Sequence, residues 1–393
     1  AVMANRIYFA NQQLSFRRDG AAGTAQWYPA HGVQSVAVTT TFNLEQAFEL
    51  GQLAIYENIE GVPDIEMTMS KVLDGYPLLY HLATQQDAVV GEHRTPTLAG
   101  RSNAKCLVAL GIWPDTQDSA SGNPVQQMEA SGMFCSAVTY NFPLEDNFSE
   151  DLTLVGNNKG WQQGITAGAI DCTNPGWAMA HETGAFPDNN DAPIGTGGIN
   201  RRENLSFAAS SADLAAAATG FDYTRLPSEI PGVDTNGWLN PRQNSANEVH
   251  LQSITVSTDL GREELFELGT RQPYARVVTF PVEVTCDIEV LSISGDLINA
   301  FADGCSTSTD PCTGIVDNLS NQTIRLATCE GLRVFLGTKN KLASVNYGGG
   351  DAGGGNVTVS YSYTTFNDFT VLHRQDPDAS GQAWWDNRQA YLA

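Results

Sequence analysis

The sequence predicts a mainly β protein with short helices, built from two tandem homologous β-sandwich or barrel domains and a long loop-rich insert. One block occurs twice, as VQSVAVTTTFNLEQAFELG at Val33–Gly51 and as LQSITVSTDLGREELFELG at Leu251–Gly269, 218 positions further along. Over Gln34–Gly51, nine of the 18 aligned columns are identical. The 37 glycines, together with many Asn, Thr and Ser residues, favour turns and short strands over long helices.

Each copy of this block begins with a pattern typical of a strand. Residues 36–42 and 254–260 alternate apolar and polar side chains in the same phase, which predicts one strand in each copy. A short helix is expected to follow, over Leu44–Leu50 and Arg262–Leu268. The glycine that closes each copy would then act as a C-cap, because glycine adopts the left-handed conformation without a steric cost.

Further blocks recur in the same order, so chance recurrence is a poor explanation. The shared pattern is an alternating strand, a short helical stretch and two later strand-like blocks. The matched pairs are Asp64–Leu73 with Val282–Leu291, Pro77–Ala83 with Asp296–Ala302, Cys106–Gly111 with Leu332–Gly337, and Val138–Val155 with Val359–Leu372.

The recurrence divides the chain into a first domain over residues 1–155 and a second over residues 250–393. Residues 156–249 have no counterpart, are rich in Gly, Asn, Asp and Pro, and contain one helical pattern at Ser211–Phe221. A loop region of this length is usually functional or binds a partner. The C-terminal tail carries aromatic side chains that we expect to dock on this chain or on a neighbour, namely Trp384, Trp385 and Tyr391.

Acidic residues occupy the polar faces of two matched strands. Asp64–Leu73 and Val282–Leu291 each alternate apolar and polar side chains, so each strand has one buried and one wet face. The acids on the wet faces are Glu66, Glu283, Asp287 and Glu289.

Composition excludes several functions. A net charge of −23 rules out an overall basic footprint for gripping nucleic acid. None of the seven cysteines forms a C-x-x-C pair, which argues against a zinc ribbon or a disulfide framework. Cys106, Cys135 and Cys286 lie in apolar strand-like runs, where buried thiols are expected. No nucleotide-binding, hydrolase or metalloprotease motif occurs, so we expect no enzyme activity, no metal and no cofactor.

Neither a secretory signal nor a membrane-spanning segment is expected. The N-terminal residues lack a basic start followed by an apolar region, and no apolar run approaches the ~20 residues of a membrane helix. The chain is therefore expected to be made in a cytoplasm.

The order of these blocks, with YNFPLEDNFSEDLTLVGNNKGW at Tyr140–Trp161 and GREELFELGTRQPYARVVTFPVEVTCDIEV at Gly261–Val290, resembles tail tube proteins of tailed bacteriophages. The resemblance covers about Gln34–Val155 and Ile199–Leu372, and it is to the kind with two fused tube domains per chain. It implies a small β-sandwich or barrel with a flanking helix, and sixfold rings that stack into a hollow tube. Three two-domain chains would then make one pseudo-hexameric ring.

The resemblance implies a structural virion protein of the tail, assembled in the host cytoplasm, that forms a trimer with itself and lets DNA pass without binding it. Tail sheath, terminator and baseplate proteins are the further partners that it implies. Like charge in a channel keeps phosphates off the wall. The acids of the wet faces would accordingly line the channel, or else face outer solvent or another subunit: Glu66, Glu283, Asp287 and Glu289.

Two other functions stay open on the sequence. A tail hub or distal tail ring protein also uses duplicated tube domains, but it would stop at one ring. A secreted β-sandwich protein for adhesion or carbohydrate binding would need a secretory signal and an aromatic, carboxylate-lined cleft. The repeated FELG marks symmetry in either phage role and carries no catalytic chemistry.

Overall fold

The computed structural model describes residues 6–18, 27–85, 95–116, 124–163, 198–208, 223–233, 249–298, 319–350 and 355–376. Most of the insert, including the predicted helix Ser211–Phe221, lies outside these residues. So do the three aromatic residues of the C-terminal tail, Trp384, Trp385 and Tyr391.

Strands dominate the described chain, and twelve of them form one antiparallel sheet. These are β1 (Gln12–Arg18), β2 (Tyr28–Pro29), β3 (Val33–Thr41), β6 (Asp64–Val72), β7 (Lys105–Ile112), β8 (Gln126–Pro143), β9 (Ser149–Gly156), β10 (Asn158–Gln163), β11 (His250–Asp259), β14 (Glu283–Leu291), β17 (Lys341–Gly348) and β18 (Thr358–Phe366).

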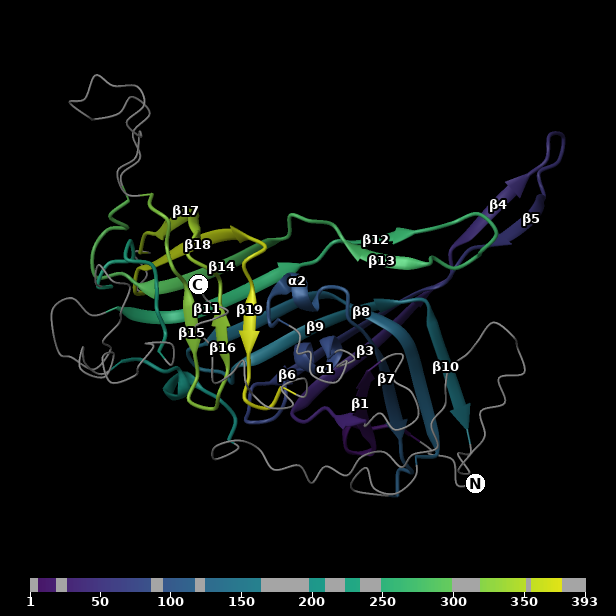
Figure 1. The fold of residues 1–393 in the computed structure, drawn as a ribbon, viewed down its shortest axis with the longest axis horizontal. Helices are drawn as coiled ribbons and strands as arrows, with labels where there is room; N and C mark the ends of the chain where they lie inside the picture. The colour runs from purple at the N-terminus through teal and green to yellow at the C-terminus, as the bar shows by residue number, and fades with distance from the viewer. Residues whose placement is uncertain are drawn as a thin grey trace.

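Smaller elements complete the fold (Figure 1). Two hairpins are separate from the hydrogen-bonded ladder of the large sheet, and a three-stranded sheet and two short helices pack close to it. The bounds are β4 (Leu44–Phe48) with β5 (Ile55–Glu60), β12 (Arg262–Leu265) with β13 (Ala275–Val278), β15 (Arg325–Ala327), β16 (Arg333–Phe335), β19 (Thr370–Leu372), α1 (Leu79–Thr84) and α2 (Leu98–Arg101), with 3-10 turns at Phe9–Asn11 and Arg202–Asn204.

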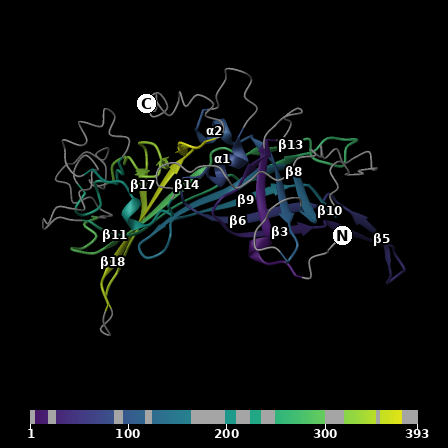
Figure 2. The ribbon, with the colours of Figure 1, turned by 90° about the horizontal axis from the view of Figure 1, so that it is seen from below.

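Eight strands of the large sheet lie in the order β3-β6-β9-β8-β11-β14-β18-β17, and every neighbouring pair is antiparallel. We call these eight strands the repeat sheet. Strand β8 is long enough to serve two sheets: its second half belongs to the repeat sheet, and its first half pairs with β7 and β10. Helices α1 and α2 lie on one side of the repeat sheet (Figure 2).

The repeat sheet consists of two four-stranded units with the same order. The first unit is β3-β6-β9-β8 and the second is β11-β14-β18-β17. The register of β3 on β6 shifts between Val33 and Ser35, and that of β11 on β14 shifts between Leu251 and Ser253. A second shift also recurs, between Cys135 and Ala137 in β8 and between Leu342 and Ser344 in β17. The two units therefore share two bulges at matched positions as well as their strand order.

The predicted helices over Leu44–Leu50 and Arg262–Leu268 are wrong. Each segment forms the first strand of a hairpin, β4–β5 or β12–β13. Leu44 pairs with Glu60 in the first hairpin, and the matched Arg262 pairs with Val278 in the second. Each segment forms a strand because a second strand follows the hairpin tip and pairs with it. The residue pattern of the first segment alone does not reveal this pairing.

The glycines of the two FELG segments do adopt the left-handed conformation, with φ of 96° at Gly51 and 94° at Gly269. They sit in the turns at the hairpin tips and not at helix ends. The backbone requirement was therefore predicted correctly and the element around it was not.

The other predicted elements have mixed outcomes. Helix α1 confirms the helical stretch at Pro77–Ala83, while residues 296–298 are not helical and the rest of Asp296–Ala302 lies outside the described residues. Cys106–Gly111 lies within β7 and Leu332–Gly337 contains β16, as expected for strands. The match of Val138–Val155 with Val359–Leu372 is shifted, because the strand order makes β17 the counterpart of β8, and β18 that of β9.

One face of the repeat sheet forms the core. The buried side chains alternate along each strand and continue across the unit boundary, for example from Tyr140 of β8 to Val256 of β11 and Cys286 of β14. Cys106, Cys135 and Cys286 are free buried thiols, as predicted. A long antiparallel sheet with one buried and one open face explains the alternation in the sequence.

A buried carboxylate interrupts the apolar face where α1 meets the sheet. Glu150 accepts hydrogen bonds from the backbone N–H groups of Leu79 and Tyr80, at 2.7 and 2.9 Å, and from the Tyr140 hydroxyl at 3.0 Å. Burial raises the pKa of Glu150, and these hydrogen bonds partly oppose that shift. The contact fixes α1 against β8 and β9.

Candidate functional site

The junction between the two units is a pair of strands, β8 and β11. Thr139 pairs with Ser257, and Tyr140 with Val256, in the middle of this junction. Tyr140 and Val256 are completely buried there. The junction therefore joins two equivalent units edge to edge with a continuous core beneath it.

The two outer edges of the repeat sheet are the counterparts of this junction. Within the described chain, β3 pairs with β6 alone and β17 pairs with β18 alone, so each has one unpaired edge. β3 matches β11, and β17 matches β8. Tyr347 of β17 is 48% exposed, whereas its counterpart Tyr140 is 0% exposed. Val38 of β3 is likewise half-buried, although its counterpart Val256 is fully buried. Each edge thus has an apolar side chain that is exposed or half-buried, whereas the counterpart residue at the β8–β11 junction is fully buried.

The open face of the repeat sheet is rich in hydroxyl groups and acids. We call it the hydroxyl-rich face. Its central rows run through Thr39, Thr68, Thr153, Thr139, Ser257, Thr285, Thr364 and their neighbours on the eight strands. Among the residues of the eight strands that point to this face, Lys341 of β17 is the single Lys or Arg. The acids on the same face include Asp151, Asp259 and all four that the sequence singled out, Glu66, Glu283, Asp287 and Glu289.

Hydrogen bonds between strands tie several of these acids to the face. The Ser362 hydroxyl donates to Asp287, and the Ser253 hydroxyl donates to Glu289 at 3.3 Å. The Asn141 amide donates to Asp151 at 2.9 Å. Glu66 and Glu283 have exposed side chains. The strand pairings bring the wet faces of β6 and β14, which carry the four acids, onto one surface that spans both units.

The second hairpin, β12–β13, lies against the first unit. The Arg262 guanidinium donates to the Cys135 carbonyl at 2.9 and 2.6 Å and lies 5.1 Å from the centre of the Phe134 ring. Arg276 forms an ion pair with Asp64 at 3.0 Å and a second one with Glu264. Charged groups from the second unit therefore anchor this hairpin on the first.

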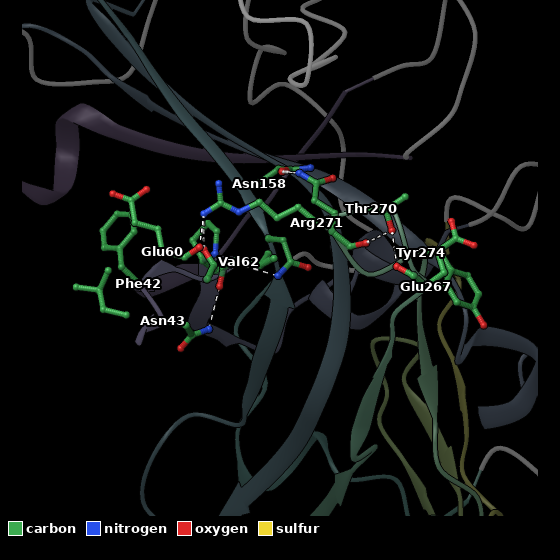
Figure 3. A pocket seen from close by; sticks show the side chains of 14 residues that line it. Phe42, Asn43, Glu60, Val62, Asn158, Glu267, Thr270, Arg271 and Tyr274 are labelled. Atoms are coloured by element: carbon green, nitrogen blue, oxygen red, sulfur yellow. Dashed lines mark hydrogen bonds between the residues drawn. The ribbon is translucent and has the colours of Figure 1, made fainter. Parts of the chain in front are cut away.

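A pocket of about 840 Å³ lies where the tip of the second hairpin meets the base of the first (Figure 3). Arg271 at the tip donates to the Glu60 carbonyl at 2.6 Å and to the Gly61 carbonyl at 3.0 Å. Val62 and Tyr274 contribute apolar surface from the two sides. The walls of the pocket belong to the contact between the tip of the second hairpin and the base of the first.

The first hairpin, β4–β5, projects away from the body (Figure 1). Every residue of β5 is exposed, whereas the matched β13 is half-buried or buried throughout. Exposed apolar side chains of this hairpin are Leu44, Phe48, Leu50, Leu53, Ile55, Tyr56 and Ile59. A large exposed apolar surface on a structured element marks an interaction site.

Sequence reasoning missed both hairpins as functional parts. The signal was present in the difference between the copies, because Arg262, Arg271 and Arg276 have no basic counterpart in the first copy. The identical residues indicate a geometry that the two hairpins share. The substituted residues indicate that the two hairpins have different surroundings.

No known protein-family model matches the chain, and no curated protein matches it. Among solved structures, one similar chain belongs to the baseplate of the anti-feeding prophage, with 11% identity and a TM-score of 0.29, covering 41% of this chain and 98% of the other. Another belongs to the cap that terminates the tube of the same particle, with 11% identity and a TM-score of 0.28, covering 42% and 95%. A third belongs to the sheath–tube complex of an extracellular contractile injection system, with 13% identity and a TM-score of 0.28, covering 42% and 95%.

The residues that the structure describes contain no group of three or more His, Cys, Asp or Glu side chains placed to hold a metal ion. They also contain no helix with the length and apolar character needed to cross a membrane.

Proposed function

We propose that this protein is a structural subunit of a phage tail tube, in which three copies close into a pseudo-hexameric ring around a channel for DNA and the rings stack. The repeat sheet carries the proposal. It contains one junction between equivalent units, and its two free edges are the two halves of a second such junction. A head-to-tail contact of this kind generates a closed ring when the rotation per unit closes.

The exposed apolar residues at the free edges support this second junction. Tyr347 is 48% exposed and Val38 is half-buried in one chain, while their counterparts at the β8–β11 junction are fully buried. An unpaired strand edge also leaves backbone N–H and C=O groups without partners in the sheet. Pairing β17 of one copy with β3 of the next would bury both kinds of group at once.

The pairing expected between β17 of one copy and β3 of the next follows from the β8–β11 pairing inside the chain. Thr139 pairs with Ser257 inside the chain. Their counterparts are Asn346 on β17 and Thr39 on β3, so these two residues are expected to pair between copies.

The hydroxyl-rich face supports the channel role. In a ring, the eight strands of each copy would continue into those of the next, and one face of the sheet would line the interior. An acidic wall repels the phosphates of passing DNA over about 8 Å at physiological salt, so the DNA slides without being held. We assign this face to the channel, with Glu66, Glu283, Asp287 and Glu289 on its wall.

A cysteine pair tests the ring. We expect Thr39→Cys with Asn346→Cys to form a disulfide between copies on oxidation, because directly opposed residues of neighbouring antiparallel strands have Cβ atoms roughly 4.5–5.5 Å apart. Covalent dimers and trimers on a non-reducing gel, and stacked rings by electron microscopy, are the expected results.

The matched control is Thr139→Cys with Ser257→Cys, which should form the same bond inside one chain. Single-cysteine variants give the background from the native cysteines. If the control pair oxidises and the Thr39–Asn346 pair gives only monomer, the proposed ring is wrong. Closed rings that never stack would instead favour the tail hub role.

A further inference from the structure

We infer that the ring contains two chemically different junctions and that the one between copies is apolar, with Leu53 of one copy packed on Phe280 and Phe366 of the next. This inference rests on the proposed ring. It adds a partner surface and a specific contact that pairing of the sheet edges alone does not require.

The contact inside the chain provides the geometric template. The tip of the second hairpin covers the base of the first, where Arg271 donates to the Glu60 and Gly61 carbonyls. In a ring of equivalent units, the tip of the first hairpin must then cover the base of the second hairpin in the adjacent copy. The four pairs next to the base have the same register in both hairpins, and the segments between them have the same length, so Leu53 of the first corresponds to Arg271 of the second.

The first hairpin lacks every basic anchor of the second. Arg262, Arg271 and Arg276 of the second hairpin correspond to Leu44, Leu53 and Asn58 of the first. No Lys or Arg occurs anywhere in residues 33–63. The first hairpin therefore cannot repeat the charged contacts that hold the second, and two of its three replacements are leucines with exposed side chains.

The base of the second hairpin is also more apolar than the base of the first. Val62 and Asn157 line the pocket beneath the second hairpin. The match of the two hairpins gives Val62 the counterpart Phe280. Extending the β6–β9 pairing by one residue, and matching it to the β14–β18 pairing, gives Asn157 the counterpart Phe366. These two phenylalanines are 46% and 54% exposed, whereas residues 61–63, beneath the second hairpin, are half-buried. The arginine tip that lies on Val62 and Asn157 has thus been replaced by a leucine tip facing two phenylalanines, so both sides of the contact between copies are apolar.

A neighbouring leucine shows that exposure alone does not define the contact. Leu50 and its counterpart Leu268 are both fully exposed at the hairpin turns, although the second hairpin is already docked. The template contact does not cover this position, so Leu50 should stay outside the junction. Leu50 and Leu53 therefore make a matched pair, with the same residue type and the same exposure on one hairpin.

A double-mutant cycle on ring formation tests the contact. We expect Leu53→Ala to raise the protein concentration needed for half-maximal ring assembly by roughly tenfold or more, because truncating a central apolar anchor is costly. Leu50→Ala should leave that concentration unchanged. In a Phe280→Ala background, Leu53→Ala should cost much less than it does alone, which is the signature of direct contact.

Each variant should stay folded as a monomer, because the substituted side chains are exposed; circular dichroism checks this. Equal effects of Leu53→Ala and Leu50→Ala overturn the inference, and so do independent, multiplicative effects of Leu53→Ala and Phe280→Ala. Either result is compatible with a ring whose Thr39–Asn346 cysteine pair still cross-links. A failure of that cross-link would instead overturn the proposed function itself.

Discussion

His373 is a buried imidazole that must stay neutral in the folded chain. Its Nδ1 accepts a hydrogen bond from the Gln375 backbone N–H at 3.1 Å, so a proton on Nδ1 would remove this contact. Burial, with the nearby His81 ring and Lys71 ammonium, lowers the pKa of His373 to about 3. The unfolded chain binds this proton near pH 6.5, and the folded chain does not.

Folding stability should therefore fall as the pH drops below about 6.5. A depressed folded-state pKa gives stability that is fully present above the unfolded pKa and is lost toward the folded one. At pH 5 the loss from His373 amounts to at most about 2 kcal/mol. His373→Asn keeps an acceptor near the Nδ1 position and should remove this part of the pH dependence.

Urea midpoints of wild type and His373→Asn, measured at pH 7 and pH 5, check this prediction. The comparison between the two proteins isolates His373 from other titrating groups, including Glu150. His250 is exposed, so His250→Asn is the control and should keep the wild-type slope. A slope that His373→Asn leaves unchanged would contradict the prediction.

At the level of elements, the two hairpins show how context decides what one pattern becomes. In both hairpins the FELG segment leads from the first strand into the turn, and its glycine adopts the left-handed conformation. The second is anchored on the first unit by Arg262, which is largely buried over Phe134, and burial lowers the pKa of this guanidinium. The first has no unit to lie on within the same chain.

Arg262→Ala should loosen the second hairpin. It removes the hydrogen bonds to the Cys135 carbonyl and the contact with the Phe134 ring, for a loss of roughly 1–3 kcal/mol of local stability. Faster amide hydrogen exchange confined to β12 and β13 is the expected observation. Arg271→Ala, at an exposed tip, should have a smaller effect; uniform acceleration across the sheet would argue against a local anchor.

The sequence carried the alternation of each strand and the phase shared by the two copies, so the repeat and the open face were predictable. It did not carry the hairpins, because Leu44–Phe48 has no strong period of its own and becomes a strand only by pairing with Ile55–Glu60. The buried Glu150 was also out of reach. Its burial depends on α1, a distant element whose backbone N–H groups satisfy the carboxylate.

At the scale of the whole molecule, the hydroxyl-rich face collects charge from both units on one surface. Reversing it with Glu283→Lys, Asp287→Lys and Glu289→Lys should slow DNA release from assembled tails, because the wall would then attract phosphates. Raising the salt concentration should restore much of the rate, since screening weakens the attraction. The rate of DNA ejection from purified particles is the measurement.

The corresponding neutral variants, Glu283→Gln, Asp287→Asn and Glu289→Gln, provide the control, because they keep hydrogen-bond acceptors and remove only the charge. They should release DNA at a rate between those of wild type and the lysine variant. Unaltered ejection from fully assembled lysine-variant tails would show that this face lies outside the channel.

Because one polypeptide carries both units, an assembly of whole copies always contains an even number of units. A free single unit can close into a ring of any size that its turning angle allows. Here β8 and β11 are paired within every copy, so units enter a ring only in twos. An odd ring would leave one unit without a place, and a small error in curvature cannot be absorbed by gaining or losing a single unit. In the proposed ring, the covalent link between the repeats would therefore restrict the ring to an even number of units.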